Sequence, residues 1–126
     1  MKIKTQEIRI GRKQVYVVDC DGELTTGMPC LLLNEAVSSI LENGGRRILI
    51  NLEKVSALGF SGRQALSDVY VAARNGNALL RVACAQKDLF HELEVHNLRP
   101  ILVTPGSLEE AVNAVAFSRH RKRKTA

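Results

Sequence analysis

The stretch "NLEKVSALGFSGRQAL", residues 51–66, joins an apolar run to a segment with helical spacing. The run at 46–52, "RRILINL", is nearly continuous in its apolar centre, which is typical of a strand covered on both faces. From Ser61 onward, the apolar residues that share one helical stripe are Leu66, Val69 and Ala73. The stretch therefore predicts a buried strand that turns directly into a helix.

Strand and helix patterns alternate along the rest of the chain, after an opening hairpin. The expected strands are 3–10, 15–22, 46–52, 78–85 and 100–103, and the expected helices are 29–43, 61–75, 87–97 and 107–117. Asp21-Gly22 is a turn signal, and "ELTTGMP" (23–29) is expected to be a loop. This order predicts an α/β fold: a single domain over residues 1–117 with a mixed, mostly parallel sheet of about four or five strands, an antiparallel first strand at its edge, and about four α-helices.

The net charge of +5 is concentrated in the last nine residues. The segment 118–126, "SRHRKRKTA", contains five of the basic residues and no acid: Arg119, Arg121, Lys122, Arg123 and Lys124. The remaining 13 basic and 13 acidic residues balance, so the domain itself is neutral. The segment is expected to be a disordered, solvated tail, with an acidic partner, anionic lipid or RNA as alternative contacts.

Composition excludes several classes of protein. No apolar run approaches the roughly 20 residues of a membrane helix, and the charged, alternating start "MKIKTQEIRIG" is unlike a signal peptide. Three cysteines without a C-x-x-C pair are expected to be reduced and buried. We therefore expect a cytoplasmic protein without membrane insertion, and no metal or cofactor site.

Catalytic interpretations of the turn are weak. "GFSGR" (59–63) departs from the nucleophile elbow G-x-S-x-G, because arginine occupies the last glycine position. Asp88 followed by His91 or His96 has the order of triad partners, but order alone does not make a site. Phosphate-binding glycine loops are absent. Ser61-Gly62-Arg63-Gln64 instead fits the capping box S-x-x-Q, so Ser61 is expected to cap the helix.

The order of elements and the phrase at 51–66 resemble the STAS domain of bacterial anti-sigma factor antagonists. The resemblance covers residues 3–117. In that family an Asp-Ser-Ser/Thr-Gly turn opens the second helix, and the first Ser is phosphorylated by a partner kinase that is also the anti-sigma factor. An earlier G-x-L-D phrase is matched by residues 22–25, and a later Gly-Leu phrase by Asn97-Leu98.

This chain departs from the family at the switch itself. Gly59 stands where the family has Asp, Phe60 where it has the phosphorylated Ser, and Thr25 where it has the Asp of the earlier phrase. Ser61 matches the second hydroxyl, and Gly62 matches the glycine. The resemblance therefore implies a non-enzymatic interaction module without the usual phosphorylation switch, in which any remaining phosphorylation falls on Ser61, Thr25 or Thr26.

The surface expected to bind a partner comprises the turn and the facing loop: Thr25, Thr26, Leu58, Gly59, Phe60, Ser61, Gly62 and Arg63. The family implies a kinase-like anti-sigma factor, a signalling assembly or a lipid-transport complex as partner, and a homodimer is a further possibility. A nucleotide-binding STAS domain is the alternative function, and nucleic acid would be bound only through the tail. Two interpretations of Phe60 stand side by side: a hydrophobic staple against Ala65, or an exposed anchor for the partner.

Overall fold

The computed structural model describes residues 1–25, 27–84, 86–95, 98, 102–103 and 107–118. Strands and helices alternate after an initial hairpin, as predicted. The strands are β1 (Lys2–Ile10), β2 (Lys13–Leu24), β3 (Arg47–Leu58), β4 (Leu79–Ala83) and β5 (Leu102–Val103). The helices are α1 (Gly27–Glu42), α2 (Phe60–Asn75), α3 (Lys87–Val95) and α4 (Leu108–Phe117).

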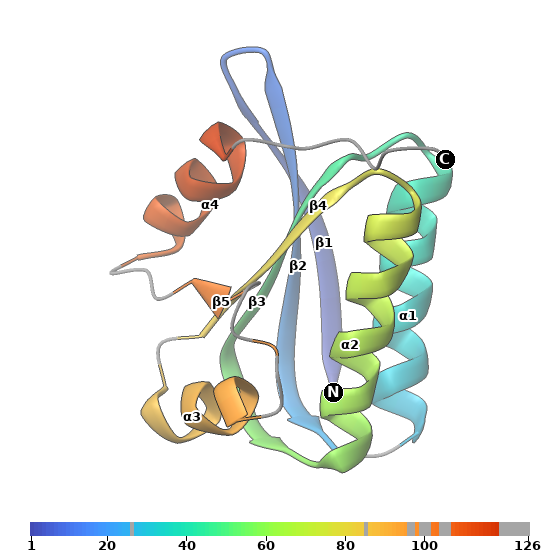
Figure 1. Ribbon diagram of the computed structural model, residues 1–126, viewed down its shortest axis with the longest axis vertical. Coiled ribbons are helices and arrows are strands. Elements are labelled where there is room, and N and C mark those ends of the chain that lie inside the picture. The colour runs from blue at the N-terminus through green and yellow to red at the C-terminus, as the bar shows by residue number, and fades with distance from the viewer. Residues whose placement is uncertain (26, 85, 96–97, 99–101, 104–106, 119–126) are drawn as a thin grey trace.

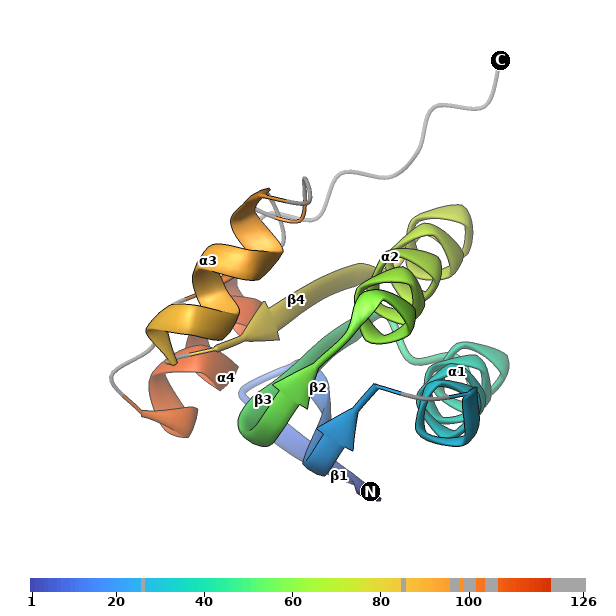
Figure 2. The ribbon, with the colours of Figure 1, turned by 90° about the horizontal axis from the view of Figure 1, so that it is seen from below.

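The sheet has the strand order β1-β2-β3-β4-β5, with β1 antiparallel to β2 and the other pairs parallel. Because each new parallel strand is added on the same side of the last, the crossover helices α1, α2 and α3 all cover one face. Figures 1 and 2 show α4 alone on the opposite face. The predicted α/β class, the mostly parallel sheet and the antiparallel edge strand are confirmed.

The core is divided by the sheet into two parts. The larger part joins alternate residues of β2, β3 and β4 to the inner faces of α1, α2 and α3, and includes Val37, Ile50 and Val69. The smaller part lies under α4 and includes Leu49 and Val115. Both faces of the central strand β3 are therefore covered by helices, which explains the nearly continuous apolar run in its sequence.

The connection from β2 to α1 is much shorter than the sequence predicts. β2 continues through Asp21-Gly22 to Leu24, because register shifts against β3 absorb the irregularity at Asp19/Asp21 and Gly22/Glu23. Gly22 has φ +122, so the turn signal marks a bulge within a strand. α1 then begins at Gly27, and the expected loop at 23–29 is reduced to about two residues.

The opening hairpin turns at Gly11 and Arg12 alone, and Gly11 has φ +61. β2 begins at Lys13, two residues before the predicted start of this strand at Val15. β3 likewise extends six residues beyond the predicted strand, to Leu58. Long pairing between β2 and β3 carries both strands to the same end of the sheet, so the turns at their ends lie together.

The remaining helices follow the sequence closely. Ser107 caps α4 by accepting a hydrogen bond from the Glu110 amide at 3.2 Å. Leu89 and Leu93 bury the inner face of α3. The predicted residues 96–97 of this helix and 100–101 of the last strand lie outside the described residues. Over the described part of the chain, no helix combines the length and the apolarity that crossing a membrane requires.

An exposed apolar surface at the carboxyl ends of the strands

One residue, Gly59, separates β3 from α2. Its backbone is extended, with φ −101 and ψ −175, and its amide donates to the Leu24 carbonyl at 3.3 Å. The Gly59 carbonyl accepts the first helical hydrogen bond, from the Arg63 amide at 3.0 Å. Gly59 is therefore the N-cap residue, and the cap has no side-chain hydrogen bond. The prediction that Ser61 caps this helix is wrong, because the N-cap is Gly59, two residues earlier, and α2 begins at Phe60.

Gly62 allows the first turn of α2 to pack directly on the end of β2. A Cβ atom at this position would lie 2.0 Å from the Leu24 carbonyl oxygen and 2.8 Å from Leu58 Cδ1. The first distance is a severe overlap with backbone, which cannot rotate away. The physical requirement for glycine at 62 is thus close approach of helix to strand, and this approach fixes where Phe60 is presented.

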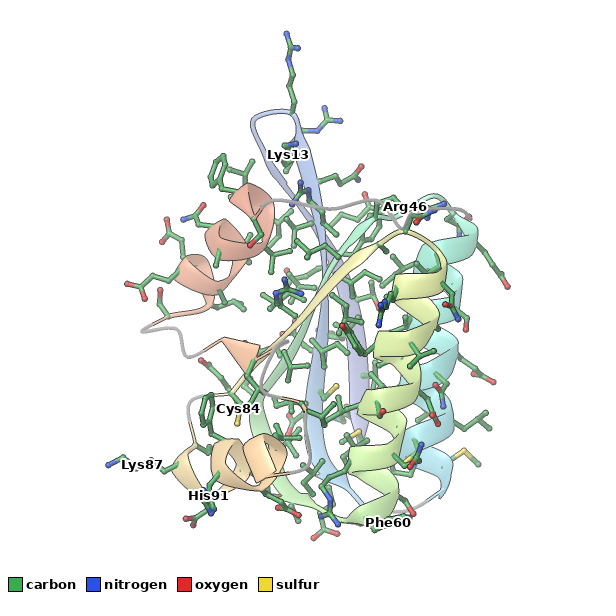
Figure 3. All side chains as sticks on the ribbon, viewed as in Figure 1. Lys13, Arg46, Phe60, Cys84, Lys87 and His91 are labelled. Atoms are coloured by element: carbon green, nitrogen blue, oxygen red, sulfur yellow. The ribbon has the colours of Figure 1, made fainter. Side chains whose placement is uncertain are left out.

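Phe60 points away from the core. It is 73% exposed at the start of α2, and Figure 3 shows it at the lower end of the molecule. The Arg63 guanidinium lies 5.8 Å from the centre of the ring and also forms an ion pair with Glu92 of α3. The hydrophobic-staple interpretation is wrong, since a stapled ring would be buried against Ala65. The Arg63 guanidinium instead lies within cation–π distance of the exposed ring.

A shallow hollow of about 140 Å³ lies beside the ring. Its described lining consists of Phe60, Arg63, Gln64, Ser67 and Leu98. The ring is thus one wall of a concavity that has the size of a small side chain.

Two further apolar residues are exposed on the first turns of the neighbouring helix α1. Met28 is 65% exposed and Leu31 is 50% exposed. Between them, the Cys30 thiol donates to the Ser61 carbonyl at 3.3 Å, which joins the first turns of α1 and α2. We call Met28, Leu31 and Phe60 the apolar end surface. Sequence reasoning missed Met28 and Leu31, although Leu31 lies off the helical stripe that predicts the buried face.

The predicted partner-binding residues divide into exposed and buried groups. Phe60 and Ser61 are exposed, and Thr25 lies next to Gly59, with a separation of 3.6 Å from the Cβ position of that glycine. Leu58 and Gly62 are buried, so their side-chain positions shape the turn from beneath and do not face a partner. Arg63 is half-buried, and Thr26 lies outside the described residues.

The surface shows no arrangement for acid–base or nucleophilic chemistry among the described residues. Asp88 and His91 are exposed on α3, and no described hydrogen bond joins Ser61 to either. Burial raises the pKa of the Cys30 thiol, which keeps the thiol protonated and poorly nucleophilic. No cluster of three potential metal ligands occurs within the described ranges. An exposed aromatic ring with neighbouring apolar side chains is suited to binding another protein.

Comparisons with known proteins agree with the fold. The STAS domain family model matches residues 9–112. The phosphorylated form of SpoIIAA, a Bacillus cell fate determinant, is 17% identical, with a TM-score of 0.67 over 89% of this chain and 99% of that chain. An anti-sigma factor antagonist from Mycobacterium paratuberculosis is 21% identical, with a TM-score of 0.68 over 90% of this chain and 94% of that chain. No curated protein sequence matches significantly.

At these identities the solved structures establish likeness of fold, and the family model establishes membership. Its match covers most of the chain, from the end of β1 into α4. The chain therefore belongs to the STAS domain family.

Proposed function

We propose that this STAS domain is a non-enzymatic regulatory module that binds a protein partner through the apolar end surface. The observation that carries the proposal is the 73% exposure of Phe60 at the first position of α2. Keeping a phenylalanine ring in water forgoes about 2 kcal/mol of burial, which a partner would recover. Aromatic side chains next to a small hollow are frequent energetic centres of protein interfaces.

The module acts without a phosphorylation switch at position 60. SpoIIAA exists in phosphorylated and unphosphorylated forms. Phenylalanine has no hydroxyl group to phosphorylate, so charge cannot be added at this position of the helix. We therefore infer constitutive binding, with Ser61, Thr25 and Thr26 as the nearby hydroxyl groups that a kinase could still modify. The partner class implied by the family is a cytoplasmic, kinase-like anti-sigma factor.

The substitution Phe60→Asp tests this proposal. It places a carboxylate at the centre of the proposed interface, and the expected loss of affinity is about 2–4 kcal/mol, the range of a central interface residue. The folded domain should tolerate the change, because Phe60 is exposed and a negative charge is favourable in the first turn of a helix. The measurement is a quantitative pulldown from native lysate, followed by titration of the captured partner.

Val71→Asp is the matched control. Val71 is an exposed apolar residue of the same helix, 49% accessible, but it lies far along α2 from the apolar end surface. We expect this variant to retain the partner that Phe60→Asp loses. Equal retention by both variants would contradict the proposed surface. The identity of the partner lost selectively would distinguish an anti-sigma factor from a signalling assembly or a lipid-transport complex.

A further inference from the structure

The end of the molecule opposite Phe60 carries a concentration of positive charge. Arg12 and Lys13 lie at the turn of the β1–β2 hairpin, and Arg46 and Arg47 lie where the chain enters β3. These four residues line a hollow of about 220 Å³, and the rest of its described lining is Gln14, Tyr16, Gly44 and Gly45. The described lining of this hollow contains no acidic residue. We call these four residues and the space between them the basic hollow.

The sheet brings the two segments together. Parallel pairing of β2 with β3 sets Tyr16 opposite Ile48, so both strands begin at the same end of the sheet. In Figure 3, Lys13 and Arg46 lie at the upper end of the molecule and Phe60 at the lower end. The charges are separated by more than thirty residues in sequence, and only the strand register makes them neighbours.

The positive charges are not neutralised within the described part of the chain. Arg46 donates to the backbone carbonyls of Gly45 at 2.7 Å and Leu41 at 3.2 Å. Arg47 donates to the carbonyls of Val115 at 2.7 Å and Ser118 at 2.9 Å. The one ion pair among the described residues is Arg63–Glu92, at the other end of the molecule. The basic hollow therefore keeps its charge available for an anion.

The C-terminal basic residues follow directly from this end. Arg47 holds the Ser118 carbonyl, and the five basic residues of the tail occupy positions 119–124 in the sequence. Phe117, the last residue of α4, is 69% exposed beside this point. A neutral domain thus presents one end on which the hollow and an exposed aromatic ring lie together.

We propose that this end binds the phosphate backbone of single-stranded RNA. Three of the four charges in the hollow are arginines, whose planar guanidinium groups match phosphate oxygens in pairs. The hollow lies beside the β1–β2 hairpin, which projects beyond the rest of the sheet (Figure 1). Such a concave site fits a strand of separate phosphates better than the flat surface of a membrane. Phe117 supplies an aromatic face on which an unpaired base can stack.

The test is fluorescence anisotropy of a 20-nucleotide poly(U) RNA with the full-length protein, over a series of salt concentrations. The variant Arg12→Gln/Lys13→Gln/Arg46→Gln removes three charges from the hollow. The matched control, Lys2→Gln/Lys4→Gln/Lys54→Gln, removes three exposed charges from the opposite end, so both variants have the same net charge. Melting curves of both check that each is folded, and Arg12→Gln/Lys13→Gln repeats the test without touching the hydrogen bonds of Arg46.

We expect the hollow variant to bind at least tenfold more weakly and the control to stay within twofold of wild type. Because single strands release about 0.7 counterion per phosphate contact, the slope of log affinity against log salt should fall by about 2 in the hollow variant. Phe117→Ala should weaken binding without changing the slope, because it removes an aromatic ring and no charge.

Three results would overturn the proposal. The first is no binding to poly(U) at about 50 mM salt, where phosphate contacts are strong. The second is equal loss in the hollow and control variants, which would show attraction by net charge alone. The third is stronger binding to vesicles of phosphatidylcholine with phosphatidylglycerol than to RNA, lost in the hollow variant, which would assign the same residues to a membrane.

Discussion

The two ends of the sheet differ in chemistry although the same strands reach both. At the carboxyl ends of the parallel strands, three large apolar side chains are exposed: Met28, Leu31 and Phe60. At their amino ends, the exposed hollow is lined by Arg12, Lys13, Arg46 and Arg47. Figure 3 shows the separation through Phe60 at one end and Lys13 and Arg46 at the other.

Helix direction explains part of this difference. α1 and α2 begin at the apolar end and finish at the basic end, so unpaired carbonyls of helix C-termini gather where the arginines lie. Arg46 binds such a carbonyl, that of Leu41 in the last turn of α1. Arg47 binds the carbonyl of Val115 in the last turn of α4. Arg46 and Arg47 therefore stabilise the fold while they keep their charge, whereas Arg12 and Lys13 make no such backbone contact in the described structure.

The largest expected effect comes from adding one methyl group at the apolar end. Gly62→Ala places a Cβ 2.0 Å from the Leu24 carbonyl oxygen, and backbone cannot move aside. We expect a loss of about 3 kcal/mol in the free energy of unfolding. At the basic end, the Cβ of Gly45→Ala would lie 2.4 Å from Ile40 Cγ2 and 2.9 Å from Tyr16 Cε2, and its nearest backbone atom, the Ile40 carbonyl oxygen, is 3.0 Å away. Because the two closest atoms belong to side chains, we expect a smaller loss of about 1–2 kcal/mol.

Urea denaturation of both variants measures the two losses. Gly59→Ala is the control, because its added Cβ would find Thr25 at 3.6 Å, an ordinary contact, and its φ of −101 suits any residue. A loss for Gly62→Ala no greater than that of Gly59→Ala would show that α2 does not pack on β2 as closely as described.

A medium effect is expected within the basic end itself. Arg47→Gln removes the charged donor that binds the carbonyls of Val115 and Ser118, and should destabilise the fold by about 1–2 kcal/mol. Arg12→Gln removes an exposed charge and should change stability by less than about 0.5 kcal/mol. Thermal denaturation of the pair checks the division between structural and free charges. Equal melting temperatures would contradict it.

The buried thiol of Cys20 should make the stability of the fold depend on pH. Burial, reinforced by Asp19, raises the pKa of Cys20 to about 12, from 9.0. The folded state therefore holds this proton more tightly than the unfolded state. The contribution of Cys20 to the free energy of unfolding is fully present below about pH 9 and is lost as the pH rises toward 12. Denaturation at pH 8, 9.5 and 11 measures this fall, and the Cys20→Ala variant should show a shallower slope. Equal slopes would exclude Cys20 as the cause.

Alkylation at pH 8 provides a second measurement of the same contrast. Cys30 is partly exposed at the apolar end, whereas Cys20 and Cys84 are buried. Cys30 should react first, slowly because burial raises its pKa, and bound partner should protect it. Labelling of Cys30 that a saturating partner does not slow would place the partner elsewhere.

The smallest expected effect is at the cap of α2. Gly59→Asp supplies a side chain that can accept a hydrogen bond from the first turn, where the structure shows none, and should stabilise the domain by a few tenths of a kcal/mol. Calorimetry measures the difference in melting temperature from wild type. A decrease in stability would show that the cap position is more crowded than its 3.6 Å contact with Thr25 indicates.

The fold class and the family can both be inferred from the sequence. The apolar stripe of α2, the apolar centre of β3 and the order of elements depend on local spacing, which is readable without coordinates. The same reasoning misplaced boundaries at Asp21-Gly22 and Ser61. A bulge and a turn favour the same types of residue, so Asp-Gly does not distinguish them. The position of a helix cap depends on which carbonyl accepts the first helical hydrogen bond.

Which residues share a surface becomes visible only in the tertiary structure. The exposure of Phe60 depends on Gly62 lying against Leu24, and its neighbours Met28 and Leu31 come from another helix. The basic hollow joins residues 12–13 to residues 46–47 through the register of β2 and β3. Such neighbours follow from long-range pairing and packing, and these depend on the whole chain. A single stretch of sequence therefore predicts its own helix or strand, but not what lies beside it.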